Sequence, residues 1–175
     1  MRRAFRSIVS LAAMGLAAAL GGLGAQADVA RTEPVPLAVL NLDYVDTSGE
    51  PTDQTGAHQR RAADFVNALQ RDLAASGHYR IVPMSCGALP CEPTMNPFEL
   101  QKAARAAGAK LVLLGGVHKM SSLIQWAKMQ IVDEEQGRIV FDRLVTFRGD
   151  TDEAWQKAES FIAREILQSA TTLVK

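Results

Sequence analysis

The sequence contains few of the residues on which many kinds of site depend. Its 175 residues include two cysteines and three histidines, and basic and acidic residues are equal at 19 each. Beyond its first residues it has no basic block, which disfavours binding to nucleic acid or anionic lipid. It also lacks the second cysteine pair of a zinc site, the Cys-x-x-Cys spacing of a redox site and the Gly-x-Ser-x-Gly motif of hydrolases. These absences leave no recognisable catalytic motif.

The clearest positive signal is at the start of the chain. Three arginines within the first six residues precede an uncharged run from Ile8 to Leu20. A glycine-rich stretch then leads to Ala25-Gln26-Ala27, and Asp28 follows. A basic start, an apolar middle and a small-x-small site are the layout of an export signal. The sequence therefore predicts cleavage between Ala27 and Asp28, and residence in the periplasm.

This segment allows two other interpretations. A retained membrane anchor is disfavoured, because glycines interrupt the run and it is shorter than the roughly 20 apolar residues of a span. Arg2-Arg3-Ala4-Phe5 partly matches a twin-arginine signal, but Arg6-Ser7 departs from it. Unfolded export is favoured, and the route stays open. No membrane span is expected after cleavage.

Residues 28–175 are predicted to form a single α/β domain of 148 residues. This part has 16 basic and 19 acidic residues, and hence a net charge of −3 with neutral histidines. Its two cysteines are separated as Cys86-Gly-Ala-Leu-Pro-Cys91. An even pair this close in an oxidising compartment predicts a structural disulfide.

Hydrophobic periodicity predicts the elements of this domain. Apolar runs predict strands at 35–42, 79–83 and 110–117, and alternation predicts antiparallel strands at 122–132 and 139–148. Helical spacing predicts helices at 55–76, from Pro97 to Gly108, and from Asp150 onward. Residues 43–56 are expected to form a long polar loop. The fold class is therefore α/β (α+β), a mixed sheet of about five strands in the order β-α-β-α-β-β-β-α.

Three local details follow from the same patterns. Asn96 is expected to cap the helix that begins at Pro97. Asp150, with Glu153 three residues later, is expected to cap the last helix as a capping box. Alternation places Ile139 with the apolar residues Phe141, Val145 and Phe147 on one face of the last strand.

Three stretches, residues 42–48, 116–124 and 147–155, resemble a family of small, uncharacterised exported proteobacterial proteins. The element order resembles the N-terminal domain of TolB and the related α/β module of the curli-secretion lipoprotein CsgG. The likeness covers about 37–167, with Asp150 and Ala154 where the family has Asn and Ser. The resemblance implies a fold and an envelope location. It implies no reaction and no catalytic residue.

Two groups of polar residues are candidates for a ligand site. Asp43 and Asp46 follow the first strand, where ligands of open α/β sheets bind, and Asp150 and Asp152 precede the last helix. If the two loops met, their carboxylates would form a cation site, although neither loop has calcium-loop spacing. Turn formation and helix capping are the simpler explanation.

His118 and Lys119 form the second group, after two glycines that permit close approach of a backbone or ligand. Acid–base chemistry at His118 requires a partner that the sequence does not identify, so a polar strand edge is favoured.

Two tryptophans are candidates for partner binding. Trp126 lies opposite Ala127 and Met129 in the strand alternation, and Trp155 lies in the first turn of the last helix. Either would anchor a partner if it were exposed, and packing in the core is the alternative.

These patterns favour a periplasmic, non-enzymatic module that binds an envelope protein or associates with itself, without a cofactor. The alternative is a small-ligand- or metal-binding accessory protein, perhaps serving a periplasmic oxidoreductase, with the acidic loops as its site. A hydrolase is third, and it requires an acid beside His118.

Overall fold

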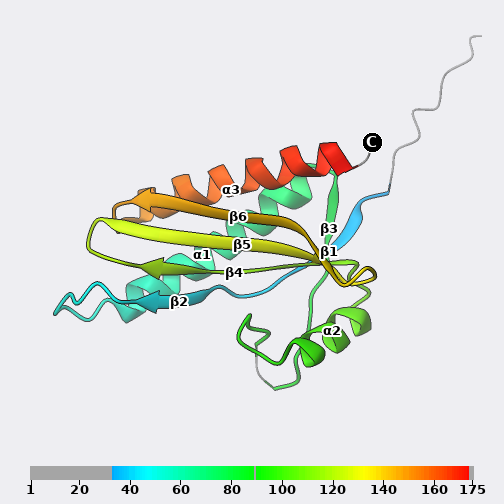
Figure 1. Ribbon diagram of the computed structural model, residues 1–175, viewed down its shortest axis with the longest axis horizontal. Helices are drawn as coiled ribbons and strands as arrows, with labels where there is room; N and C mark the ends of the chain where they lie inside the picture. Colours follow the sequence, from blue (N-terminus) through cyan, green and yellow to red (C-terminus); the bar gives the residue numbers. More distant parts are fainter. Residues whose placement is uncertain (1–32, 89, 174–175) are drawn as a thin grey trace, which may run out of the picture. The chain divides into compact units, whose positions relative to one another are not determined.

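The computed structural model describes residues 33–88 and 90–173, which form a sheet with three helices (Figure 1). The expected signal segment and its cleavage site at Ala27 and Asp28 lie outside the described residues. The strands are β1 Val35–Val39, β2 Asp43–Asp46, β3 Tyr79–Ile81, β4 Leu111–Lys119, β5 Ile124–Asp133 and β6 Arg138–Arg148. The helices are α1 Thr55–Ala75, α2 Pro97–Ala106 and α3 Asp152–Leu173.

The sheet is mixed, as the sequence predicts. Its strands lie in the order β3-β1-β4-β5-β6, and β2 pairs with β4 beside β1. The strands that alternate with helices pair in parallel, because each helical crossover returns the chain to the end of the sheet at which the preceding strand began. The last three strands form an antiparallel meander, with a tight turn between β5 and β6 that contains Gly137 at φ 62°.

One strand departs from the expectation. Residues 43–46, expected as loop, form β2, which pairs with Gly116–Lys119 of β4. β1 and β2 lie along the same edge of β4, so they are one strand with a break at residues 40–42. At the break the N–H of Asn41 donates to the carbonyl of Cys91 at 3.3 Å. The polar composition of this segment concealed the strand, because each of its two sides carries one aspartate, beside Tyr44 on one side and Val45 on the other.

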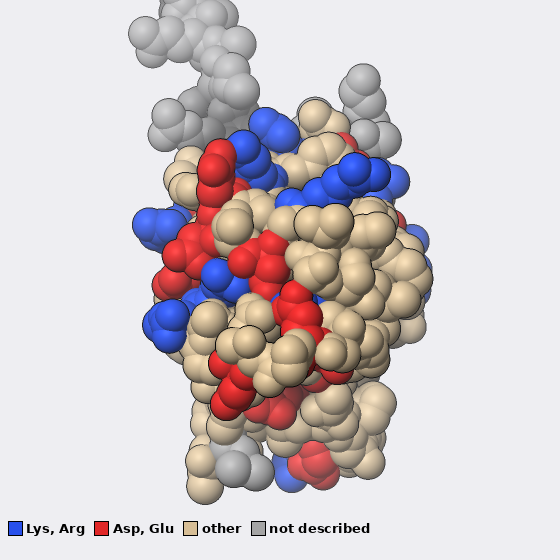
Figure 2. All heavy atoms as spheres, turned by 90° about the vertical axis from the view of Figure 1, so that its left-hand side faces the viewer, with Lys and Arg blue, Asp and Glu red and all other residues tan. Residues whose placement is uncertain are grey.

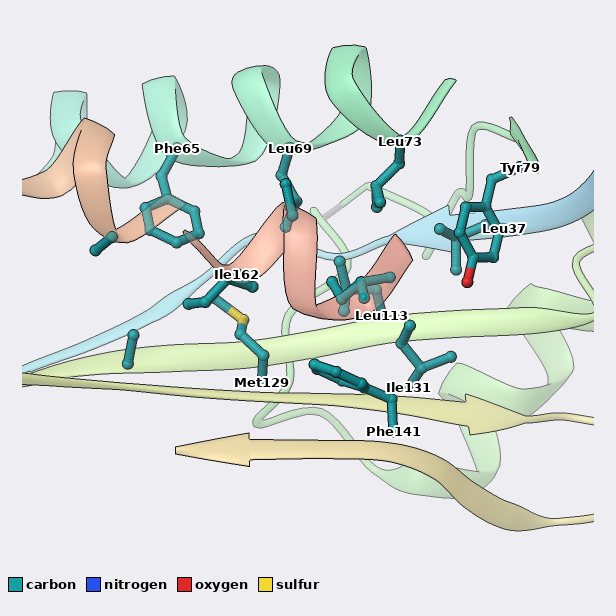
Figure 3. Packing of buried hydrophobic residues seen from close by; sticks show 14 of the residues in the cluster. Leu37, Phe65, Leu69, Leu73, Tyr79, Leu113, Met129, Ile131, Phe141 and Ile162 are labelled. Carbon is teal, nitrogen blue, oxygen red and sulfur yellow. The ribbon is translucent and has the colours of Figure 1, made fainter. Parts of the chain in front are cut away.

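The main core lies between one face of the sheet and the helices α1 and α3. Helical spacing on α1 directs Phe65, Leu69 and Leu73 to the sheet, where they meet Met129 and Ile131 of β5 and residues of α3 (Figure 3). All five of these side chains are buried. Removal of this apolar area from water, at about 25 cal/mol per Å², is the main force that holds α1 and α3 on the sheet.

A smaller core lies on the opposite face, under α2 and the loop before it. Ala38 and Val112 of the sheet meet Leu100 and Ala104 of α2, and Cys91 packs beside them. The predicted disulfide is confirmed: Cys86 and Cys91 are bonded, with their Cα atoms 5.3 Å apart. In Figure 1, α2 lies below the sheet near one end of the long strands, while α3 runs along them above. None of the described helices covers the rest of this second face, which we call the open face.

The cap of α2 is as predicted, and that of α3 is not. The Asn96 side chain accepts from the N–H of Phe98 at 2.9 Å, ahead of Pro97 in the first turn. For α3 the cap is Thr151, whose hydroxyl accepts from the N–H of Ala154 at 3.2 Å. Asp150, expected in this role, faces other partners, because nearby cations compete for its carboxylate.

Ile139 also lies on the other side from the expectation. Val132 pairs with Ile139 and Ile131 with Phe141, so the register shifts by one residue at this point. The shift reverses the alternation. Ile139 is therefore half exposed, whereas Phe141, Val145 and Phe147 contact the main core as expected.

Candidate functional site

A buried ion-pair cluster lies at the end of the sheet where β2, β4 and β6 all terminate. Its centre is Lys119, whose side chain is fully buried. The Lys119 ammonium donates to Glu50 at 2.5 Å and to Asp150 at 2.7 Å, and Asp46 lies 3.8 Å away. This is the end of the molecule that Figure 2 faces, where acidic side chains gather across the middle of the surface.

Asp150 is the most connected carboxylate of this cluster. Its two oxygens are 2.7 Å from His58 Nε2, Arg61 and Lys119. Gln125 and Trp155 also donate to it, each at 3.3 Å. Burial alone would raise the pKa of Asp150, but the hydrogen bonds and charges of Lys119 and His58 outweigh it and lower this pKa to about 2. Asp150 is therefore a carboxylate under all ordinary conditions.

Aromatic rings enclose the buried imidazole of the cluster. The His58 ring stacks on Tyr44 at 4.5 Å between centroids, and Trp155 lies beside both. Burial raises the pKa of the Tyr44 phenol, and the charges of Asp46 and Asp150 raise it further. Tyr44 therefore contributes a neutral ring and no phenolate.

The chemistry of the cluster suits a structural role, in which ion pairs hold neighbouring elements together. Burial lowers the pKa of Lys119, but the hydrogen bonds that it donates to Asp150 and Glu50 outweigh this effect. The net pKa is raised, which opposes action as a base or nucleophile. Two of the carboxylates expected as cation ligands, Asp46 and Asp150, lie around this ammonium. Among the residues that the structure describes, no group of three or more His, Cys, Asp or Glu side chains is placed to hold a metal ion. The cluster joins β2, β4, α1 and α3.

The six predicted ligand residues fall on two faces of the sheet. Strand alternation puts Asp46 and Lys119 on the helix side, in the cluster with Asp150, and it puts Asp43 and His118 on the open face. Asp152 is 90% exposed and pairs with Arg61 at 2.7 Å. The convergence of Asp43 with the other carboxylates, which the cation-site interpretation requires, does not occur.

The open face carries a groove of about 450 Å³ between β2, β4, β5 and the loop before α2. Gly116 leaves its floor without a side chain, and the carbonyl oxygen of Asp43 lies 2.9 Å from where a Cβ would be. Exposed apolar side chains flank it: Val45 at 44%, Trp126 at 38% and Leu144 at 54%. We call this the open-face groove.

Three polar side chains around the open-face groove, those of His118, Lys128 and Gln130, are already paired. His118 Nε2 lies 2.8 Å from the Thr47 hydroxyl, and its ring meets Trp126 edge to face. Lys128 pairs with Asp142 of the neighbouring strand. The partner of His118 is thus a hydroxyl and a tryptophan ring, not the acid that a hydrolase would need.

The two tryptophans have different environments. Trp126 is partly exposed in the open-face groove, as a partner-binding residue must be. Trp155 is 2% exposed and contacts Phe65 and Phe147 in the main core, because it lies on the sheet-facing side of α3. The hypothesis that Trp155 anchors a partner is therefore wrong for this structure.

Sequence reasoning missed His58, Arg61 and Gln125 of the cluster. The sequence does contain an indication of them, because each is a polar residue at a position that hydrophobic periodicity assigns to the core. His58 is four residues before Ala62 on the apolar side of α1, and Gln125 has the parity of Ala127 on β5. Polar residues at buried positions need partners, so such positions indicate a network.

None of the described helices has the length and apolar character of a membrane span.

Comparison with known proteins gives one family match. The family model described as "Protein of unknown function (DUF2380)" matches residues 35–167. A comparison with curated proteins gives no match.

Several solved structures are similar at low identity. TolB from Acinetobacter baumannii is 15% identical with a TM-score of 0.49, over 81% of this chain and 29% of TolB, so this chain spans under a third of that protein. The PelC dodecamer from Paraburkholderia phytofirmans is 15% identical with a TM-score of 0.49, over 81% of this chain and 89% of PelC. The LpoB C-terminal domain from Escherichia coli is 18% identical with a TM-score of 0.48, over 64% of this chain and 81% of that domain.

Proposed function

We propose, for a chain that belongs to the family of proteins of unknown function DUF2380, that it is a non-enzymatic interaction module of the cell envelope. It acts in the periplasm and binds a partner protein through the open-face groove. The occupant is an apolar anchor side chain of that partner, inserted over Gly116. The observation that carries the proposal is the exposure of Val45, Trp126 and Leu144 around a floor without a side chain.

The composition of the groove supports a protein as its occupant. Protein interfaces have an apolar centre, often with Trp, and a polar rim. The three apolar side chains supply the centre, and Asp43, His118 and Gln130 lie around it. Lys128 at this rim is already paired with Asp142, so its charge does not require a charged ligand. An uncharged anchor with polar flanks fits this surface.

The groove is also rigidly supported. Lys119 and Val117 of β4 point to the opposite face from His118 and are buried there, in the cluster and the main core. β4, which forms the floor at Gly116, is thus fixed from behind. A preformed surface loses less conformational entropy on binding, which favours affinity.

Site-specific photo-crosslinking in living cells tests the proposal. A photoreactive residue at Leu144 is expected to give one discrete adduct with another envelope protein. The same residue at Phe161, which is 40% exposed on α3, is the matched control and is expected to give none. The protein in the adduct is then identified, purified and titrated against the wild-type domain.

The titration decides the outcome. Leu144→Lys places a charge in the apolar centre and is expected to weaken binding at least tenfold, whereas Phe161→Lys leaves the Kd unchanged. A Kd that does not respond to Leu144→Lys would overturn the proposal. An adduct between two copies of this chain would replace the partner protein with self-association.

Export itself needs a separate check. The intact mass of protein from the periplasm is expected to correspond to a chain that begins at Asp28, less about two hydrogens for the disulfide. A mass that includes residues 1–27 would contradict cleavage.

A further inference from the structure

A second hollow of about 250 Å³, separate from the open-face groove, lies between α1 and α3. It is lined by one side of each helix, from Arg61 to Arg71 on α1 and from Asp152 to Glu159 on α3. Phe65, Ala68 and Trp155 make part of its wall apolar. We call it the helix cleft. Its volume is below the 300–1,000 Å³ typical of drug-sized ligands, so it suits a small group.

Glu159 is the unusual residue of the helix cleft. It lines the hollow yet is 2% exposed, so it belongs to the floor. Its Oε2 accepts from the Ser160 hydroxyl at 3.2 Å, while its Oε1 is buried without a hydrogen-bond partner within the described part of the chain. Burial of an acceptor without a donor destabilises a fold, which makes an unpaired carboxyl at the base of a hollow an indication of a ligand.

The charges around Glu159 indicate which ligand fits. Asp64 and Asp152 line the cleft with it, and Asp72 is close enough to raise its pKa. Of the two arginines, Arg61 is bound to Asp150 and Asp152. The positive charge of Arg71 lowers the pKa of Glu159 and so opposes the effect of Asp72. The acidic groups outnumber the cations, so the cleft favours a positive ligand.

We propose that the helix cleft binds a small organic cation, a protonated amine or guanidinium carried on a short apolar group. Its N–H donates to Oε1 of Glu159, and its apolar part lies against Phe65 and Trp155. The same chemistry is found in a free amine and in a Lys or Arg side chain of a protein. The site does not depend on the open-face groove, which lies on the other face of the sheet.

The charge state of Glu159 gives the site a pH dependence. Burial raises the pKa of Glu159 to about 7, and the charge of Asp72 adds to the rise. The charged groups around it are Arg61, Asp64, Arg71 and Asp72 from α1 and Asp152 from its own helix. Since the carboxylate form attracts the cation, affinity is expected to rise as the pH increases through about 7.

Benzylamine and benzyl alcohol, which differ in charge and little in shape, are the first probes. Binding is followed by calorimetry and by the fluorescence of Trp155 in protein that carries Trp126→Phe. Benzylamine is expected to bind saturably, and benzyl alcohol at least tenfold more weakly. Equal affinity for the two, or no saturable binding of benzylamine, would overturn the proposal.

Two variants separate the site from a general charge effect. Glu159→Gln keeps the size and removes the charge, and it is expected to weaken benzylamine binding at least tenfold and to abolish its pH dependence. Glu153→Gln removes the same charge from the exposed start of α3, where Glu153 pairs with Lys157, and is expected to leave binding unchanged. Equal loss in both variants would refute a specific site.

Agmatine and a blocked arginine amide distinguish the sources. Tighter binding of agmatine indicates a free amine as the ligand, and tighter binding of the blocked arginine indicates a side chain of a protein. Failure of both to compete with benzylamine would contradict the class of ligand proposed.

Discussion

Asp150 shows how one residue can hold several elements together. Its carboxylate contacts His58 and Arg61 of α1, Lys119 of β4 and Gln125 of β5, while its own backbone leads into α3. Loss of this charge would leave a fully buried ammonium with Glu50 as its close partner. Breaking a buried pair at one side is more destabilising than the pair is stabilising, because the remaining charge stays desolvated.

Asp150→Asn is accordingly expected to lower the free energy of unfolding by about 3 kcal/mol, measured by urea denaturation at neutral pH. Asp152→Asn is the matched control: its carboxylate is 90% exposed, so a change of about 0.5 kcal/mol or less is expected. The pKa of Asp150 is lowered from 3.8 to about 2, so its stabilisation is present above about pH 4 and is lost as the pH falls toward 2. Equal effects of the two variants would contradict the structural role of the buried ion pairs of Asp150.

Glu159 has the opposite pH dependence. Burial raises its pKa from 4.5 to about 7, so the folded state holds the proton more tightly than the unfolded state does. Its contribution is present below about pH 4.5 and is lost as the pH rises through about 7. Glu159→Gln is expected to remove this decline and to be more stable than wild type at pH 8, by up to about 3 kcal/mol. Denaturation curves across this range check it, and an unchanged pH profile would argue against a buried carboxyl.

At the scale of elements, the position of β4 depends on how closely its glycines let neighbouring strands approach. A Cβ on Gly115 would overlap the carbonyl oxygen of Lys128 and the sulfur of Met129, both on β5. Gly115 therefore allows β5 and Met129 of the main core to pack closely against β4. Gly56, near the start of α1, has open space around it, with an Arg60 nitrogen 3.9 Å away as the nearest atom.

Gly115→Ala is thus expected to destabilise the fold by at least about 2 kcal/mol, because an overlap with backbone cannot be relieved by a rotamer change. Gly56→Ala is expected to stabilise it by about 0.5 kcal/mol through helix propensity. Thermal unfolding of both variants measures the difference. A neutral Gly115→Ala would mean that β4 and β5 are less tightly packed than described.

Element prediction from the sequence succeeded where periodicity is strong. The apolar spacing of α1 from Ala62 to Leu73 and the alternation of β5 gave both type and face. It failed at β2, where none of the four residues is fully buried, and at Ile139, where a register shift that no residue marks reverses the face.

The candidate site was predictable in part. Lys119, Asp46 and Asp150 were identified as polar residues at strand ends and do come together. Their partner His58 comes from a helix 92 residues away in sequence from Asp150, and only the packing of α1 against α3 brings the two into contact. The exposure of Trp126 and the burial of Trp155 likewise depend on which faces the helices cover.

At the scale of the whole molecule, the two faces of the sheet have different supports. One face is covered by α1 and α3, and the other by α2 and a short bridged loop over part of its length. The disulfide closes a small loop, so its direct stabilisation is modest, about 2 kcal/mol. Its position near the open-face groove bears more on the proposed function than its stabilising energy does.

A variant with both Cys86→Ser and Cys91→Ser is expected to lose about 2 kcal/mol of unfolding free energy while keeping the main core, because the cysteines pack in the second core and α1 and α3 pack in the main core. Denaturation followed by Trp155 fluorescence, in a Trp126→Phe background, measures this. Complete loss of folding would show that the second core is not separable from the first.

The hydrogen bond from Asn41 to Cys91 links the open-face groove to the oxidation state of the cysteines. It fastens the bridged loop to the break before β2, and Pro93 and Thr94 of the same loop line the open-face groove. Thiols stay reduced in the cytoplasm. On the export route proposed above, a newly made chain lacks the bridge that secures one wall of the proposed docking surface. Oxidation after translocation would complete that wall, so maturation and partner binding would occur in the same compartment.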